Sequence, residues 1–438
     1  MIWTLALRCF WLVSNTLVSM SKDVVCTQIL AVLIVLHGHA SSALAVEPLS
    51  SADRLRQFME QVRPQQSASE AGDQAVRQGA DASPARLQER ADLLKSGETA
   101  LSRLDVAAAT DAFERAALIL HAADTEIALV RAYMQGGDYR RSLAFGAHTA
   151  GSHLDVIGGS TLYAWLLHVG GQPDLAQRML AASESRMPGN PVVASVQQQL
   201  RSNRPVAAGQ LLMPPTRLAP YGSAKGLPDT ARVSGSALLL QSGTGALMPL
   251  SLLPRTGKLW LRNGLGQLAT ARIAQRFDDL KVALVRLDSP LPVPEQLLVA
   301  PGETPPGSPG FAVEYVSSPD AAPAWPVLRS GSLGGARGDS DERLLGIDMP
   351  AGPRGGPVFD GYGRLTGLAL QGSSGASALS DDTLVLVSQL RKALVGALAS
   401  EQFNVQEAPS PSGPRPRGLV EKIYESSLKI SLQVITAP

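Results

Sequence analysis

A repeat of about 34 residues constrains this chain more than any other feature. Between residues 90 and 190, small and aromatic residues recur at that spacing. The recurring positions are Gly97, Ala109, Phe113 and Ala116 in the first unit, Gly137-Asp138-Tyr139 in the second, and Gly171, Ala176, Leu180 and Pro188 in the third. Small residues let two helices approach closely, and a helix pair hides its apolar face only by stacking on a neighbour. The repeat therefore predicts three stacked helix pairs.

The spacing and the Ala-x-x-x-Phe-x-x-Ala pattern of the first unit resemble tetratricopeptide repeats, over residues 85–200. The resemblance implies a concave groove that holds a peptide or a partner helix. The alternative is that the helix pairs serve only as a structural cap on the following domain. The histidines of this region, at no metal-ligand spacing, are interpreted as core or surface residues; they are His121, His148, His153 and His168.

A second motif, the glycine-rich octamer Gly352–Phe359, lies in the C-terminal half of the chain. It resembles the Gly-Asn-Ser-Gly-Gly-Pro-Leu/Val segment of trypsin-like serine proteases, most closely the high-temperature-requirement family of the bacterial envelope. Residues 360–368 resemble the turn and strand that follow the serine in that family. Further matches occur in the family's order, at residues 235–240, 245–253, 280–287, 330–333 and 384–387. The resemblance implies a double β-barrel over residues 230–400, so that the fold class is multidomain, helical repeats followed by an all-β domain.

All three catalytic positions depart from the family's pattern. Leu252 occupies the histidine position, or Ser251 if one residue is skipped, Lys281 occupies the aspartate position, and Arg354 replaces the serine. The chain has no histidine after His168. Guanidinium has no lone pair with which to attack a carbonyl, and loss of nucleophile or base costs about a million-fold in turnover. We therefore expect a protein that is not an enzyme.

Two interpretations of this degenerate site remain open. In the first, a desolvated Lys281 acts as the base toward Ser251, and hydrolysis is retained. In the second, Asp278 and Asp279 form a solvated turn or are ion-pair partners of Lys281, and the site has no base.

The octamer's backbone N–H groups also predict a nest that binds an anion. The nest would comprise Gly352, Arg354 and Gly355, with Lys281 adding positive charge. The alternative is that Arg354 forms an ion pair with a nearby aspartate such as Asp279.

The N-terminal 45 residues are interpreted as a secretory signal, with Met20 as a possible true start. Residues 24–36 are apolar, and residues 41–45 form a small-x-small cleavage pattern. A retained membrane anchor is the competing interpretation, but the run is short for a bilayer span. No later segment is long and apolar enough to cross a membrane. The expected location is periplasmic or secreted in a bacterial envelope.

The remaining segments are expected to be connectors. Residues 46–84 predict a polar tether with a short helix, residues 201–229 an extended linker over the barrel surface, and residues 401–417 a proline-rich linker. Residues 418–438 alternate between apolar and polar positions and predict a helix or an added strand that docks on its own domain or on a partner.

Composition excludes several classes of function. The formal net charge of +1 gives no global attraction to nucleic acid. Both cysteines, Cys9 and Cys26, lie in the expected signal, which leaves no thiol ligand for a metal, and no cofactor is expected. The sequence thus favours an exported, non-catalytic adaptor or assembly factor that binds a protein or peptide through the repeat groove or the C-terminal segment. An unusual serine endopeptidase and a periplasmic holdase chaperone are the alternatives.

Overall fold

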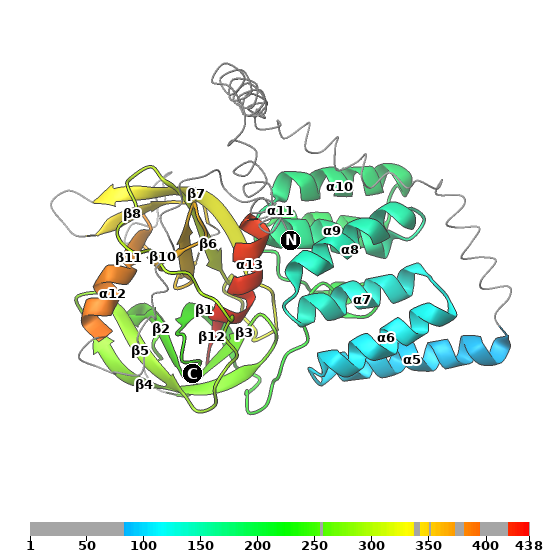
Figure 1. Cartoon of the computed structure of the whole chain (residues 1–438), viewed down its shortest axis with the longest axis horizontal. Helices are drawn as coiled ribbons and strands as arrows, with labels where there is room; N and C mark the ends of the chain where they lie inside the picture. Colours follow the sequence, from blue (N-terminus) through cyan, green and yellow to red (C-terminus); the bar gives the residue numbers. More distant parts are fainter. Residues whose placement is uncertain are drawn as a thin grey trace, which may run out of the picture. The chain divides into compact units, whose positions relative to one another are not determined.

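The helical region consists of consecutive helix pairs (Figure 1). The computed structural model describes residues 83–437, apart from 255–256, 337–341, 350–351, 373–380 and 395–418. The predicted signal, nearly all of the N-terminal tether and the proline-rich linker therefore lie outside the described residues. The helices are α5 (Pro84–Ser102), α6 (Val106–Ile119), α7 (Ala123–Gln135), α8 (Tyr139–Ser152), α9 (Ile157–Val169), α10 (Pro173–Arg186) and α11 (Pro191–Arg201).

Local sequence explains how these helices start and how they pack. Asp105 and Asp138 cap α6 and α8, because each side chain accepts a hydrogen bond from a backbone N–H of the first turn. Phe113 of α6 is buried against α5, where a Cβ at Gly97 would lie 2.4 Å from its ring. The second helices of the pairs begin at residues 106, 139 and 173, which is the period expected from the sequence.

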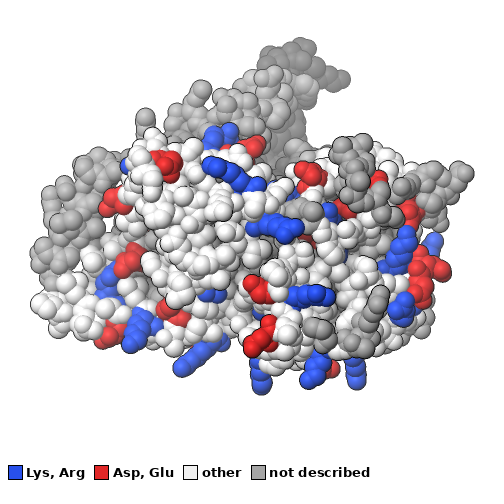
Figure 2. Space-filling view, turned by 180° about the vertical axis from the view of Figure 1, so that it is seen from behind, with Lys and Arg blue, Asp and Glu red and all other residues white. Residues whose placement is uncertain are grey.

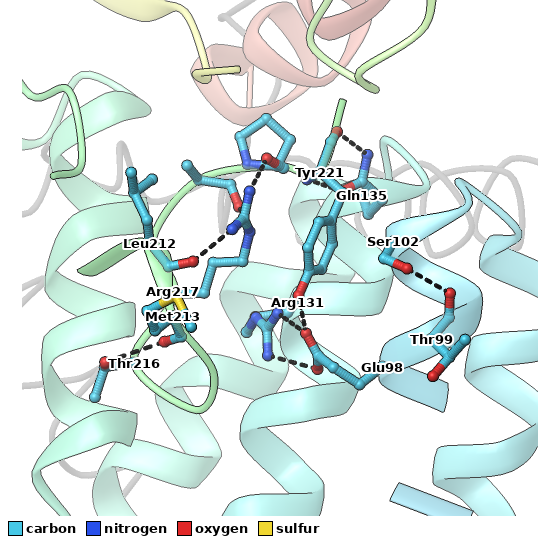
Figure 3. Close-up of polar contacts among 12 residues, drawn as sticks. Glu98, Thr99, Ser102, Arg131, Gln135, Leu212, Met213, Thr216, Arg217 and Tyr221 are labelled. Atoms are coloured by element: carbon cyan, nitrogen blue, oxygen red, sulfur yellow. Dashed lines mark hydrogen bonds and ion pairs between the residues drawn. The ribbon is translucent and has the colours of Figure 1, made fainter. Parts of the chain in front are cut away.

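Residues 201–229, which connect the helices to the strands, are held by polar contacts with α5 and α7 (Figure 3). Arg131 donates two hydrogen bonds to the carboxylate of Glu98, at 3.0 and 2.8 Å, and the Tyr221 hydroxyl also contacts this carboxylate. Arg217 bonds three backbone carbonyls of its own segment, and its guanidinium lies 3.9 Å from the centre of the Tyr221 ring. Residues 201–229 contain a short 3-10 helix at Gly209–Leu212. They contact the first barrel, where the Ser223 N–H donates to the carbonyl of Gly266, and Tyr221 also joins them to the helices.

Two closed, antiparallel, six-stranded barrels follow, consistent with a trypsin-like double barrel. The first contains β1 (Arg232–Leu239), β2 (Gly245–Pro249), β3 (Leu259–Asn263), β4 (Leu268–Phe277), β5 (Val282–Leu287) and β12 (Ser431–Thr436). The second contains β6 (Pro309–Glu314), β7 (Val327–Ala336), β8 (Arg343–Gly346), β9 (Pro357–Asp360), β10 (Leu365–Leu370) and β11 (Thr383–Leu386), and α12 (Val387–Leu394) follows. Five of the matched sequence segments fall on β1, β2, β5, β7 and β11, and the octamer ends on β9.

Strand β12 gives the first barrel the same pairing order as the second. In the second barrel the first strand, β6, pairs with the second strand, β7, and the fourth, β9. β12 pairs in the same way with β1 and β3. If β12 is counted first and β1–β5 follow, every pairing of one barrel has its equivalent in the other. The C-terminal strand therefore supplies the first strand of the first barrel, and the barrel pair extends beyond residues 230–400.

Helix α13 (Leu419–Ile430) joins this strand to the helical region. Tyr424 is fully buried and meets Tyr139 of α8 edge-on, with ring centroids 4.5 Å apart. Arg140 donates hydrogen bonds to the carboxylate of Glu425 through both its backbone N–H and its guanidinium. The helices and the barrels therefore belong to one compact part of the chain, Pro64–Pro438. Residues 419–436 are thus engaged within the chain, so a partner bound through them would have to displace a buried strand.

Within the described residues, no helix combines the length and the apolar character that a membrane span requires.

Candidate functional site

An open cleft of about 730 Å³ is lined by the predicted histidine position and by one residue of the octamer, but not by Lys281 or Arg354. Leu252 and Pro353 both line it, so the structure brings the histidine position and the octamer to one cavity. The other lining residues come from the segment after α11, β1, the residues after β2, the segment after β6, and β12 with the residue that follows it; they include Arg204, Arg232, Ser251, Ser317 and Thr436. The cleft therefore has hydroxyl and guanidinium groups on its walls and an apolar side chain at the histidine position expected from the sequence.

Arg354 is buried and ion-paired. Its Nε donates to Oδ2 of Asp382 at 2.7 Å, and its Nη1 donates to the carbonyl of Gly352 at 2.8 Å. The side chains of Arg354 and Asp382 are only 9% and 6% exposed. The partner is thus Asp382, just before β11, and not Asp279 as the sequence suggested. The guanidinium is held by its own barrel.

The predicted anion nest already has an internal acceptor. The N–H groups of Gly355 and Gly356 donate to Oε1 of Glu314, at 3.3 and 2.9 Å. Gly355 has a φ of +139°, and a Cβ there would lie 2.0 Å from the carbonyl oxygen of Ser236, so only glycine fits. The backbone donors of the octamer therefore bind a carboxylate, and it is one that belongs to the chain.

Glu314 is a buried carboxyl at the end of β6. Burial raises its pKa to about 7, although Ser236, the positive charge of Arg354 and the two glycine N–H groups act in the opposite direction. Its second oxygen, Oε2, is buried and has no hydrogen-bond partner among the described residues. Desolvation of the buried carboxyl group disfavours its charged form, which is why its pKa lies above the ordinary value of 4.5.

Lys281 does not join the nest. Its side chain is 61% exposed and forms an ion pair with Glu342. The residue adopts a φ of +56° at the end of the turn formed by residues 278–281, where its N–H bonds the carbonyl of Asp278 at 3.0 Å. Asp278 pairs with Arg276 instead. The nest therefore contains Gly355 and Gly356, with Arg354 beside them, and the Lys281 ammonium lies at the surface, directed to Glu342 rather than to Ser251.

Two residues of this site have no motif in the sequence. Glu314 ends an apolar strand, and Asp382 lies in an acidic pair that precedes another strand. An acidic residue next to an apolar run is a weak indication of burial, because most such residues are solvated. Only the fold brings these two carboxylates to the octamer.

Comparison with known proteins gives likeness to solved structures only. No family model matches the sequence, and no curated protein matches it. The chain is similar to the crystal structure of the inactive form of the Rv3671c protease, with 12% identity over 38% of this chain and 89% of that one, at a TM-score of 0.30. The active form of the same M. tuberculosis protease gives 14% identity over 42% and 84%, also at a TM-score of 0.30. Likeness of this extent carries no argument about what the present chain does.

Proposed function

We propose that this chain is an exported, non-catalytic adaptor that binds an extended segment of a partner protein in the cleft between its barrels. The observation that carries the proposal is the combination of an open cleft of about 730 Å³ with the groups that surround it. Leu252 lines the cleft, Arg354 is bound to Asp382, and the octamer's N–H groups are bound to Glu314. The space for a peptide is retained, whereas the groups that would cut one are replaced or engaged.

The same groups argue against hydrolysis. Acyl transfer needs a nucleophile, a base and donors aimed at a developing oxyanion. A donor that already binds a buried carboxylate would have to exchange it for the oxyanion, and no imidazole follows His168 in the sequence. Ser251 is one of several hydroxyl residues on the cleft wall, and the Lys281 ammonium that could have served as its base pairs with Glu342 instead.

The helix pairs supply a second surface in this proposal. We assign them to the tetratricopeptide type on the period of their second helices and on the close contact of Gly97 with Phe113. The assignment of export rests on the N-terminal sequence. On the face shown in Figure 2, the Lys/Arg and Asp/Glu residues of the described part are interspersed, which suits a protein partner better than nucleic acid.

A single substitution tests the cleft. Ser251→Trp places a large ring in the cleft, because Ser251 is exposed on its wall; Ser289→Trp adds the same ring at an exposed position outside the lining. We expect a partner recovered stoichiometrically from envelope extract with the wild-type chain to be lost with Ser251→Trp and kept with Ser289→Trp. Equal recovery with both variants contradicts binding in the cleft. Covalent labelling of the wild-type chain by a fluorophosphonate probe contradicts the non-catalytic assignment.

A further inference from the structure

Three histidines and one glutamate converge at one end of the helix pairs. Glu126 lies in the first turn of α7, His121 just before this helix, His148 in the last turns of α8, and His153 at the end of α8. The Nε2 atoms of His148 and His153 each lie 3.4 Å from a carboxylate oxygen of Glu126, and His121 Nε2 contacts the same carboxylate. Figure 1 shows that α7 and α8 are neighbours in the stack.

The burial of these groups suits an ion site with an open side. Glu126 is 1% exposed and His153 is 10% exposed, whereas the side chains of His121 and His148 are about half exposed, at 51% and 52%. The inner ligand atoms are thus shielded from water, and the outer imidazoles face solvent. An ion can enter from that side without unfolding a helix.

The groups that converge include both nitrogen and oxygen ligands. Three imidazole nitrogens face the one carboxylate of Glu126. The ring centroids of His121 and His153 are 5.9 Å apart and those of His121 and His148 are 6.3 Å apart, so the rings surround the carboxylate without stacking closely on each other. Imidazole nitrogen and carboxylate oxygen are together the ligands that a divalent transition metal uses in proteins.

The distances bring these groups to the spacing of metal ligands. Zinc binds histidine nitrogen at about 2.0–2.1 Å, which places neighbouring ligand atoms of a tetrahedron about 3.4 Å apart. The Nε2 atoms of His148 and His153 lie at this distance from different oxygens of Glu126, and the ligand atoms of His121, Glu126 and His153 all lie within 4.8 Å of one another. The Ser152 hydroxyl lies 3.5 Å from Nδ1 of His148, in the place where an outer group steadies a ligating imidazole.

We infer that the imidazoles of His121 and His153 and the Glu126 carboxylate form a binding site for a divalent transition metal, with the His148 imidazole beside them and with zinc as the ion that this nitrogen and oxygen set suits best. The inference differs from the sequence-based interpretation of these histidines as core or surface residues outside any metal site. It is independent of the proposed function of the barrels.

Metal binding to the full chain tests the site. We expect equilibrium dialysis against ZnCl₂ to give one Zn²⁺ per chain with a Kd of about 1 µM or lower, and MgCl₂ to give none, since Mg²⁺ prefers oxygen ligands. X-ray absorption of the zinc-loaded chain should show nitrogen and oxygen ligands at about 2.0–2.1 Å and no sulfur at 2.3 Å, which separates the site from the cysteines.

Variants locate the ion. Glu126→Gln and His153→Ala should each weaken zinc binding by more than the 10- to 100-fold typical of outer-shell residues. His168→Gln is the matched control, because His168 is also a buried helical histidine but lies outside the cluster; it should bind zinc as the wild type does. Circular dichroism checks that each variant is folded. Failure of the wild-type chain to bind zinc, or unchanged binding by both cluster variants, overturns the inference.

Discussion

Replacing Arg354 with serine places a hydroxyl at the nucleophile position expected from the sequence and tests how the buried ion pair stabilises the octamer. Arg354→Ser removes the guanidinium that donates to Asp382 at 2.7 Å. The Asp382 side chain is only 6% exposed, so the ion pair that is lost lies in a poorly solvated place. We therefore expect the variant to lose stability and to gain no activity.

The magnitude follows from the burial of both partners. Breaking a buried ion pair by removing one partner costs about 3–5 kcal/mol, because the other charge remains uncompensated. Adding Asp382→Asn removes this charge and keeps an oxygen for the N–H of Gly372, which bonds Asp382 at 3.2 Å. The double variant should therefore recover at least half of the loss, with a coupling free energy of about 2 kcal/mol or more.

Urea unfolding followed by tryptophan fluorescence measures these differences, since Trp260 and Trp325 are buried in the barrel region. Arg276→Ser is the matched control: its ion pair with Asp278 is exposed on both sides, at 54% and 71%, so its loss should cost less than about 1 kcal/mol. A cost for Arg354→Ser no larger than that of the control, or strictly additive effects with Asp382→Asn, would refute the reasoning. Labelling of the new serine by a fluorophosphonate would refute the claim that the missing imidazole prevents catalysis.

Three further predictions concern other parts of the molecule. Burial raises the folded-state pKa of Glu314 to about 7, so its contribution to stability is present below the ordinary pKa of 4.5 and is lost as the pH rises through about 7. In unfolding measured from pH 4.5 to 8, the free energy of unfolding should fall by about 3 kcal/mol from this group, and Glu314→Gln should remove that fall. For Glu98, burial raises the pKa, but the hydrogen bonds and the positive charge of Arg131 outweigh burial, so that the net shift of the pKa is downward. The contribution of Glu98 to the free energy of unfolding should therefore be present above pH 4.5 and be lost as the pH falls, and Arg131→Met should abolish that acid sensitivity in the same measurement. Val434→Asp places a charge in the fully buried strand β12 and should prevent closure of the first barrel, which would be seen as loss of the near-ultraviolet circular dichroism signal. The control Lys422→Asp lies on the exposed side of α13 and should leave the spectrum unchanged.

The parts of the fold that sequence predicted are those whose pattern is local. Gly97 and Phe113 meet because they lie on adjacent helices of one pair, and Asp138 caps a helix that begins at the next residue. The matched barrel segments likewise lie on single strands, where alternating or continuous apolar residues predict burial without knowledge of the partner strand.

The contacts that sequence did not predict join residues far apart in the chain. Asp382 is 28 residues from Arg354, Glu314 is 42 residues from Gly356, and the zinc-type cluster joins two helices and the residue before α7. Spacing along one helix or one short motif predicts ligands only when they share that element. Here the ligands come from different elements, so their meeting depends on how the elements pack.

Strand β12 adds a constraint on how the cleft forms. Its pairing joins Thr436 to Arg232, and the Thr436 and Ser234 hydroxyls lie 2.6 Å apart, so the first barrel closes only through a contact between residues about 200 positions apart. Closing so long a loop is entropically costly and slow. Thr436 and Ala437 also line the cleft that contains Leu252. The proposed binding surface therefore includes residues that follow from the pairing of β12 with β1 and β3, and it is complete only when the first barrel has closed.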